Sequence, residues 1–142
     1  MGIMVTGGSG LVGSTINADV KLSSKDADLR NWNETISIFE KYKPKEVIHC
    51  AGSNMNYKGE FFYDNIMINT NVLEACRITG VKKVVSFLST CIFPDDIEYP
   101  LTEKKIHIGE PHNSNYAYAY AKRMLDIQSR AYKEQYGVNH YV

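Results

Sequence analysis

The chain has 142 residues, of which 44% are hydrophobic, and this size and composition fit one globular domain with a buried core. The 16 Lys and Arg residues balance 16 Asp and Glu residues, which excludes a strong net field that would attract nucleic acid or an anionic membrane. Any anion-binding site must therefore be local.

Two features of the sequence indicate the cellular compartment: the cysteine pattern and the lack of long apolar runs. Cys50, Cys76 and Cys91 are odd in number and far apart, a pattern typical of neither a disulfide framework nor a metal site. No stretch approaches the roughly 20 apolar residues that a membrane span needs. We expect a cytoplasmic protein with no metal site and no membrane span.

The first half of the chain alternates short apolar runs with helical patterns. An apolar run at residues 2–6 stops at a glycine-rich turn, after which residues 11–18 can form a helix. Residues 20–23 predict a second strand, residues 32–42 a helix, and residues 46–50 a third strand.

The second half continues this alternation. We expect a helix over residues 61–79, a buried strand over 83–88, a long loop over 89–114, a helix over 115–136 and a further strand from Val138. Gly80 and Gly137 follow the two helices, as C-terminal caps do.

Strands that alternate with helices of this length predict an α/β fold. Each right-handed crossover returns the chain to the same edge of the sheet, so the strands run parallel. We predict a Rossmann-like, doubly wound parallel sheet that is incomplete in this chain. Ligands of such sheets bind at the carboxyl ends of the strands.

The turn after the first strand has the glycine spacing of a phosphate-binding loop. Gly7 would permit the tight turn, Gly10 would let a pyrophosphate approach the backbone, and Gly13 would let the helix pack close to the strand. The helix N-terminus would then face the anion. Three glycines alone also fit a merely structural turn, but the position between a strand and a helix favours a dinucleotide site.

The segment after the second strand bears on the choice of cofactor. A carboxylate directly at that strand end would favour NAD, whereas Ser23, Ser24 and Lys25 could bind a 2′-phosphate, which favours NADP. Lys25 could equally be a solvated loop charge. Asp28 could accept a hydrogen bond from the adenine amino group, or it could help to start the following helix.

A tyrosine and a lysine four residues apart form a candidate catalytic pair. Tyr118 and Lys122 project from one face of the predicted helix, where the ammonium should favour the phenolate and lower the tyrosine pKa. Tyr118 could then donate a proton to a carbonyl that is being reduced. Ser89 follows a strand end and could hold the oxygen of that carbonyl. The alternative is that Tyr116, Tyr118 and Tyr120 form a packing stripe, but the glycine turn and Ser89 together favour catalysis.

Several longer segments carry a specific resemblance. They are residues 23–29 (SSKDADL), 47–52 (VIHCAG), 89–95 (STCIFPD), 111–115 (PHNSN) and 118–124 (YAYAKRM). Together with the glycine turn they resemble the extended short-chain dehydrogenase/reductase family, and within it the GDP-L-fucose synthases. The similarity runs along nearly the whole chain.

This resemblance implies a two-stage reaction on GDP-4-keto-6-deoxy-D-mannose. The sugar is epimerised at C3 and C5, and NADPH then reduces the 4-keto group. Ser89, Tyr118 and Lys122 match the reduction residues, and Cys91 matches the base that takes the proton beside the ketone. From chemistry alone, Cys91 could instead be a small buried apolar residue.

The resemblance also implies the cofactor, the partners and the state of assembly. The cofactor is NADP(H), the partner is a GDP-sugar substrate, and a homodimer would form through the helices at residues 61–79 and 115–136. The cofactor-binding residues that we expect are Gly7, Gly10, Leu11, Val12, Gly13, Lys25, Asp28, Ala51 and Lys122.

The chain departs from the family in three places. Family members are more than twice as long, so we expect residues 1–142 to be the N-terminal, NAD(P)-binding part, with the C-terminal substrate domain absent. The connection at residues 7–19 and the loop after Ala51 are both shortened, which puts NADPH affinity in doubt. Without neighbours, the strand at Val138 would be a bare edge that favours association or instability.

Two other functions stay open. The chain could be a non-catalytic NADP-binding remnant that assembles through its helices. It could also be another sugar-nucleotide epimerase or dehydratase of the same fold, in which Cys91 is structural. His49, His107 and His112 receive no catalytic or metal-binding role, because a hydrogen-bonded scaffold histidine is the commoner case.

Overall fold

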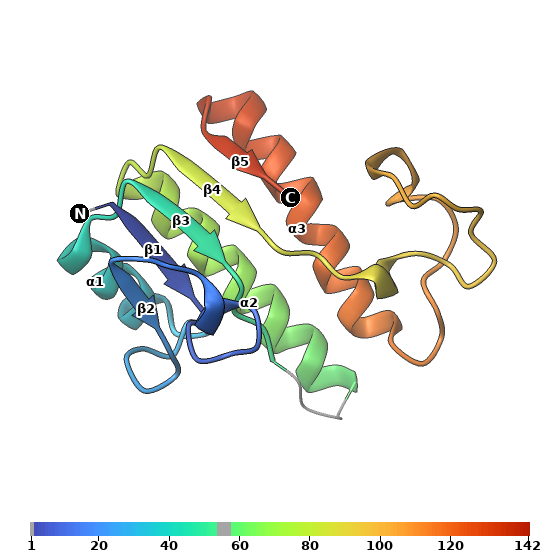
Figure 1. The fold of residues 1–142 in the computed structure, drawn as a ribbon, viewed down its shortest axis with the longest axis horizontal. Coiled ribbons are helices and arrows are strands. Elements are labelled where there is room, and N and C mark those ends of the chain that lie inside the picture. Colours follow the sequence, from blue (N-terminus) through green and yellow to red (C-terminus); the bar gives the residue numbers. More distant parts are fainter. Residues whose placement is uncertain (1, 54–57) are drawn as a thin grey trace.

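The computed structural model describes residues 2–53 and 58–142. Within these residues, five short strands and three α-helices follow one another (Figure 1). The strands are β1 (Ile3–Thr6), β2 (Val20–Leu22), β3 (Glu46–His49), β4 (Lys83–Ser86) and β5 (Asn139–Tyr141), and the helices are α1 (Trp32–Tyr42), α2 (Lys58–Ile78) and α3 (Tyr116–Tyr136).

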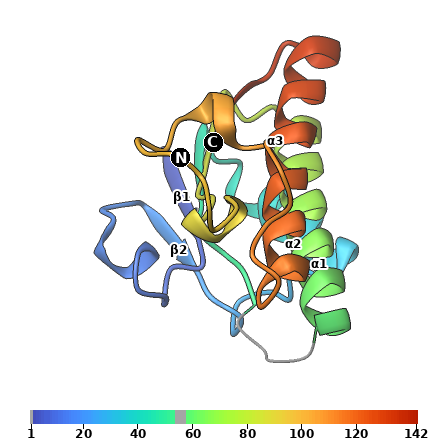
Figure 2. The same cartoon turned by 90° about the vertical axis from the view of Figure 1, so that its right-hand side faces the viewer.

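The strands form one parallel sheet in the order β2-β1-β3-β4-β5. Thr6 lies opposite His49, and His49 lies opposite Ser86, so these three side chains form a row near the carboxyl edge. Figure 2 shows α1, α2 and α3 on one side of the sheet and the connection from β1 to β2 on the other. The predicted α/β fold with a parallel, Rossmann-like sheet is confirmed.

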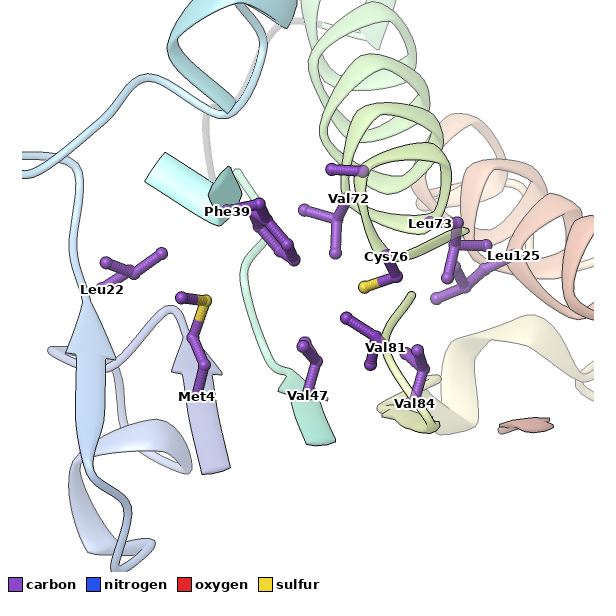
Figure 3. Close-up of a cluster of buried hydrophobic side chains, with 11 residues drawn as sticks. Met4, Leu22, Phe39, Val47, Val72, Leu73, Cys76, Val81, Val84 and Leu125 are labelled. Carbon is purple, nitrogen blue, oxygen red and sulfur yellow. The ribbon is translucent and has the colours of Figure 1, made fainter. Parts of the chain in front are cut away.

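The core lies between the sheet and the three helices (Figure 3). Met4, Leu22, Val47 and Val84 point from the strands toward the helices, and these four side chains and Phe39 of α1 are almost wholly removed from solvent. Val72, Leu73 and Cys76 of α2 and Leu125 of α3 complete this layer. Each fully buried side chain of this size contributes about 1.5 to 3 kcal/mol through the hydrophobic effect.

The prediction of a helix at residues 11–18 is wrong. Only Gly13–Thr15 form a single 3-10 helical turn, and Leu11 is 91% exposed. The backbone N–H of Gly8 donates to Leu22 O (2.7 Å) and that of Asp19 donates to Ile3 O (3.0 Å), so both ends of the connection are attached to the sheet.

The physical reason for the missing helix is the length of the connection. The glycine turn takes up residues 7–12, and six further residues in a helix would span only about 9 Å. A four-residue strand such as β1, along which the connection must return, is about 13 Å long. The chain therefore crosses this face in a more extended form, and within the described residues no α-helix covers it.

The other elements agree with expectation to within a few residues. The helix α1 has the predicted bounds, because the Asn31 side chain accepts from the N–H groups of Asn33 and Glu34, and Lys43 ends the helix in the left-handed conformation. The helix α2 begins three residues earlier than predicted. None of the described helices is long and apolar enough to span a membrane.

Candidate functional site

The turn after β1 packs tightly against the end of β3. Gly7 has a positive φ of 70°, and a Cβ atom there would lie 2.7 Å from the backbone nitrogen of Ala51. A Cβ on Gly13 would lie 2.3 Å from Gly7 O. Both positions therefore require glycine on steric grounds, although Gly13 begins a 3-10 turn that packs against the glycine turn and not an α-helix that packs on the strand.

The part of the turn expected to bind a pyrophosphate is only partly formed. A Cβ on Gly10 would lie 3.2 Å from Gly7 O, and Leu11 and Val12 follow with exposed side chains. Because the described part of this connection holds one 3-10 turn in place of a helix, the aligned N–H groups and dipole of a helix N-terminus are missing here. The expected helix contribution to phosphate binding is therefore wrong for this chain.

The segment after β2 is ordered by its own carboxylates. Asp26 accepts from the N–H (2.8 Å) and the hydroxyl (2.7 Å) of Ser23, and the Ser23 backbone hydrogen bond lowers the pKa of Asp26. Lys25 is exposed. Both oxygens of Asp28 accept from Arg30, at 2.9 and 2.8 Å, and these side-chain hydrogen bonds lower the pKa of Asp28.

Sequence reasoning did not single out Arg30, which is the partner of Asp28. Its guanidinium forms an ion pair with Asp28 and approaches Asp64 of α2 at 3.4 Å. The signal was available, since an arginine two residues after an aspartate in a loop is placed to pair with it. Arg30 thus connects the segment after β2 to α2 through Asp28 and Asp64.

Tyr118 and Lys122 lie together in the first half of α3. Lys122 is 3% exposed, and its ammonium donates to Phe87 O (3.1 Å) and lies 5.7 Å from the centroid of the Tyr118 ring. Burial lowers the pKa of Lys122. The helix thus presents both side chains to the chain segment that leaves β4.

The expected lowering of the Tyr118 pKa is wrong. Burial raises the pKa of Tyr118, and negative charge on Cys91 raises it further. Desolvation of the half-buried ring disfavours the phenolate, although the ammonium of Lys122 lies 5.7 Å from the ring centroid. The hydroxyl of Tyr118 is therefore kept protonated, which suits a proton donor.

Ser89 and Cys91 lie in the short 3-10 turn Thr90–Ile92 and its N-cap. Ser89 is the N-cap, and its hydroxyl oxygen accepts from the Cys91 N–H at 3.4 Å. Cys91 is near enough to act on both Tyr118 and Lys122. Its negative charge raises the pKa of Tyr118 and opposes the lowering of the Lys122 pKa that burial causes. The structure thus brings the four predicted catalytic residues to one region at the carboxyl edge of the sheet.

A second thiol, which sequence reasoning did not single out, lies near the same lysine. Burial raises the pKa of Cys50 and the positive charge of Lys122 opposes this change. Ala51, the next residue, is buried, and its N–H donates to the Thr6 hydroxyl at 3.4 Å. Most of the loop after Ala51 that we expected to be shortened, at residues 54–57, lies outside the described residues.

A buried polar network joins the sheet to α2 and α3. His49 accepts at Nδ1 from the Thr6 hydroxyl (2.7 Å) and donates at Nε2 to Asn69 Oδ1 (2.9 Å). Asn69 Nδ2 donates to the carbonyl of Ala121, the residue before Lys122. Burial first, and then Lys122, lower the pKa of His49 to about 4, so it is neutral at pH 7.

Two hollows lie beside these residues. A cavity of about 350 Å³ at the carboxyl end of β4 is lined by residues that include Ser89, Phe93, Leu101 and Val142. A groove of about 480 Å³ between α2 and α3 is lined by Phe62, Tyr116, Tyr120 and Met124, among others. Within the described residues, no group of three His, Cys, Asp or Glu side chains is placed to hold a metal ion.

Known proteins match the chain along nearly its whole length. The sequence pattern of the NAD dependent epimerase/dehydratase family matches residues 3–142. A GDP-L-fucose synthase of Dictyostelium discoideum is 52% identical over 152 residues, covering 95% of this chain and 48% of that protein. The crystal structure of a GDP-L-fucose synthetase from Naegleria fowleri bound to NADP is 48% identical, with a TM-score of 0.89, and the match covers 99% of this chain and 47% of that one.

The chain therefore spans about half the length of the curated relatives that it matches. The match lies in the part of those proteins that forms the parallel sheet, which agrees with the resemblance found in the sequence.

Proposed function

Because the chain belongs to the NAD dependent epimerase/dehydratase family, we propose that it is the N-terminal, NADP(H)-binding part of an enzyme that converts GDP-4-keto-6-deoxy-D-mannose to GDP-L-fucose. The observation that carries the proposal is the grouping of Ser89, Cys91, Tyr118 and Lys122 at the sheet edge where the glycine turn also lies. The part of the relatives that this chain does not match would then hold the substrate-binding domain.

The residues present fit the two ends of the cofactor unequally. Tyr118 and Lys122 form a complete pair for the nicotinamide ribose, with the ammonium held by Phe87 O. Gly7 and Gly13 have no side chains, so a pyrophosphate could approach the backbone there. The α-helix that would follow such a turn is, however, absent from the described connection. We therefore expect weak NADP(H) binding, with Lys25 beside the 2′-phosphate and Asp28 near the adenine.

The proposed chemistry assigns one task to each side chain. Bound NADPH supplies the hydride for the 4-keto carbon. Tyr118, whose raised pKa keeps it protonated, donates its proton to the carbonyl oxygen, and the Ser89 hydroxyl stabilises the same oxygen. Lys122 holds the ribose. Cys91, as a thiolate, removes the protons at C3 and C5 that the adjacent ketone acidifies, and a second side chain, acting as acid, returns a proton to the opposite face of each carbon.

The proposed partners follow from the same assignment. The substrate is a GDP-sugar, and a homodimer would bury the groove between α2 and α3. The cytoplasm is the proposed compartment, since the free cysteines Cys50, Cys76 and Cys91 fit reducing conditions.

Titration of the purified chain with NADPH, followed by nicotinamide fluorescence, tests the cofactor site. Lys122→Met should weaken binding about tenfold, because a charge-assisted hydrogen bond is lost. Lys133→Met removes the same charge from an exposed position of the same helix and should leave the affinity unchanged. No saturable signal from the wild-type chain, or equal losses in the two variants, would contradict the assignment.

A second candidate is a non-catalytic NADP-binding remnant, which the 3-10 turn in place of the phosphate-binding helix favours. Both candidates predict that the 142-residue chain alone converts little or no GDP-4-keto-6-deoxy-D-mannose. Joining the chain to the C-terminal half of a relative separates them, since only the first candidate predicts that NADPH oxidation is then restored. Cys91→Ser in that protein should abolish epimerisation and retain some reduction, whereas a structural Cys91 would tolerate the change.

A further inference from the structure

A buried arginine lies next to the proposed catalytic lysine on α3. Arg123 is only 6% exposed, although it carries a full positive charge. Within the described residues no carboxylate forms an ion pair with it. A buried charge without an acidic partner is costly unless polar groups replace its hydration.

Backbone carbonyls replace that hydration. The guanidinium of Arg123 donates through Nε (2.9 Å) and through Nη2 to Ile92 O, and through Nη1 to Gly109 O (2.8 Å). Its charge also lies 5.5 Å from the centroid of the Tyr120 ring. All three hydrogen bonds thus go to the long segment between β4 and α3, two of them near its start at Ile92 and one near its end at Gly109.

The carbonyl that accepts two of these hydrogen bonds belongs to the residue after Cys91. Ile92 is buried and ends the 3-10 turn Thr90–Ile92, so a hold on its carbonyl also limits the movement of Cys91. The arginine that provides this hold follows Lys122 directly in the helix that carries Tyr118. Arg123 therefore connects the turn with the thiol to the helix with the phenol and the ammonium.

We propose that Arg123 is a positioning residue that fixes the Cys91 turn against α3 and so holds the thiol beside Tyr118 and Lys122. The role of Cys91 in this statement rests on the proposed function, but the mechanical role of Arg123 does not. The second attachment, at Gly109, keeps the rest of the segment folded over the same helix.

Hydrogen exchange measured residue by residue tests this role without any need for activity. The amides of Ile92 and Phe93 are hydrogen-bonded within the turn, to Ser89 O and Thr90 O, and report on its opening. Arg123→Met should speed their exchange about tenfold, the effect of losing one charge-assisted hydrogen bond. Amides in the buried part of α2, from Val72 to Cys76, report global unfolding and should keep their rates.

Two further variants make the result specific. Arg130→Met removes an arginine from an exposed position of α3, where it pairs with Asp126, and should leave the turn unchanged. Arg123→Lys keeps the charge with fewer donors and should restore part of the protection of Ile92 and Phe93, which makes it the informative variant if the methionine variant does not fold. Alkylation of Cys91 should rise in parallel with exchange, while the fully buried Cys76 stays protected.

Unchanged exchange at Ile92 and Phe93 in Arg123→Met would overturn the proposal. An equal increase in the α2 amides would also overturn it, because Arg123 would then act on overall stability alone. Neither result depends on NADPH titration, so the proposal can fail while the cofactor site stands, and the reverse also holds.

Discussion

At the scale of single residues, two buried histidines show how hydrogen-bond partners decide what burial costs. His49 uses both ring nitrogens, with Thr6 and Asn69 as partners. Neither nitrogen of His140 has a partner among the described residues. Burial lowers the pKa of each histidine to about 4. Both are therefore neutral at pH 7, but only His49 is hydrogen-bonded among the described residues.

Replacement of each histidine by leucine should separate these two cases. His49→Leu leaves buried polar atoms of Thr6 and Asn69 without a partner and should lower the free energy of unfolding at pH 7 by about 3 kcal/mol. His140→Leu removes two unpaired polar atoms and should change it by less than about 1 kcal/mol. Urea unfolding at pH 7 measures both values, and equal losses would contradict this account of the network.

The same pKa values predict acid sensitivity. The unfolded chain takes up a proton on each histidine below pH 6.5, whereas the folded chain does so only near pH 4. Stability is thus full above pH 6.5 and falls as the pH drops toward 4, by about 3 kcal/mol for each histidine. His140→Leu should show a smaller loss over this range than the wild type, and identical pH profiles would argue against burial of His140 in solution.

At the scale of elements, the connection from β1 to β2 is the part that departs most from a regular α/β unit. Its two ends are bonded to the sheet, and its glycine turn packs on Ala51. This tight packing, more than the glycine spacing, decides how well the turn can bind an anion. With a bare backbone but no helix behind it, the turn offers an anion few aligned donors.

Two glycines with similar backbone angles allow that packing to be measured. Gly7 and Gly80 have φ values of 70° and 73°, but a Cβ meets the Ala51 backbone at Gly7 and nothing within 4 Å at Gly80. Gly80→Ala should cost about 1 kcal/mol from backbone strain alone. Gly7→Ala should cost clearly more in urea unfolding, because backbone atoms must move. Similar costs would mean that the turn is not packed on β3.

At the scale of the whole molecule, the three helices cover one face of the sheet and leave α2 and α3 with an apolar outer surface. Four large apolar side chains on these helices are more than two-fifths exposed, namely Phe62, Tyr63, Met124 and Ile127. Phe62 and Met124 also line the groove between the two helices. Burial of such a surface against a second copy is the proposed basis of a homodimer.

A charge placed in this groove should disrupt the dimer. Met124 is 48% exposed, and Met124→Glu would bury an unpaired carboxylate in the proposed interface. Light scattering after size-exclusion chromatography should then show a monomer where the wild type is a dimer. Ile108→Glu adds the same charge at a loop position that is 55% exposed and should leave the mass unchanged. A dimer in the Met124→Glu variant would place the interface elsewhere.

The sequence by itself determined the order of the five strands, the three α-helices at residues 32–42, 58–78 and 116–136 to within a few residues, and the bounds of α1. These features depend on signals within a few residues, such as the Asn31 cap, the left-handed Gly80 and Gly137, and the spacing of Tyr118 and Lys122. Ser89 and Cys91 were singled out by the resemblance of the segment at residues 89–95 to the family.

Only the tertiary structure decided the features that depend on distances between remote segments. The helix at residues 11–18 is lost because the sheet holds both ends of a connection that is too short for it. The Tyr118 pKa rises because the fold buries the ring and brings Cys91 near it, neither of which the spacing of Tyr118 and Lys122 reveals. Arg123 looks like any charged helix residue in the sequence, and its role depends on carbonyls 14 and 31 residues away, which folding alone brings to it.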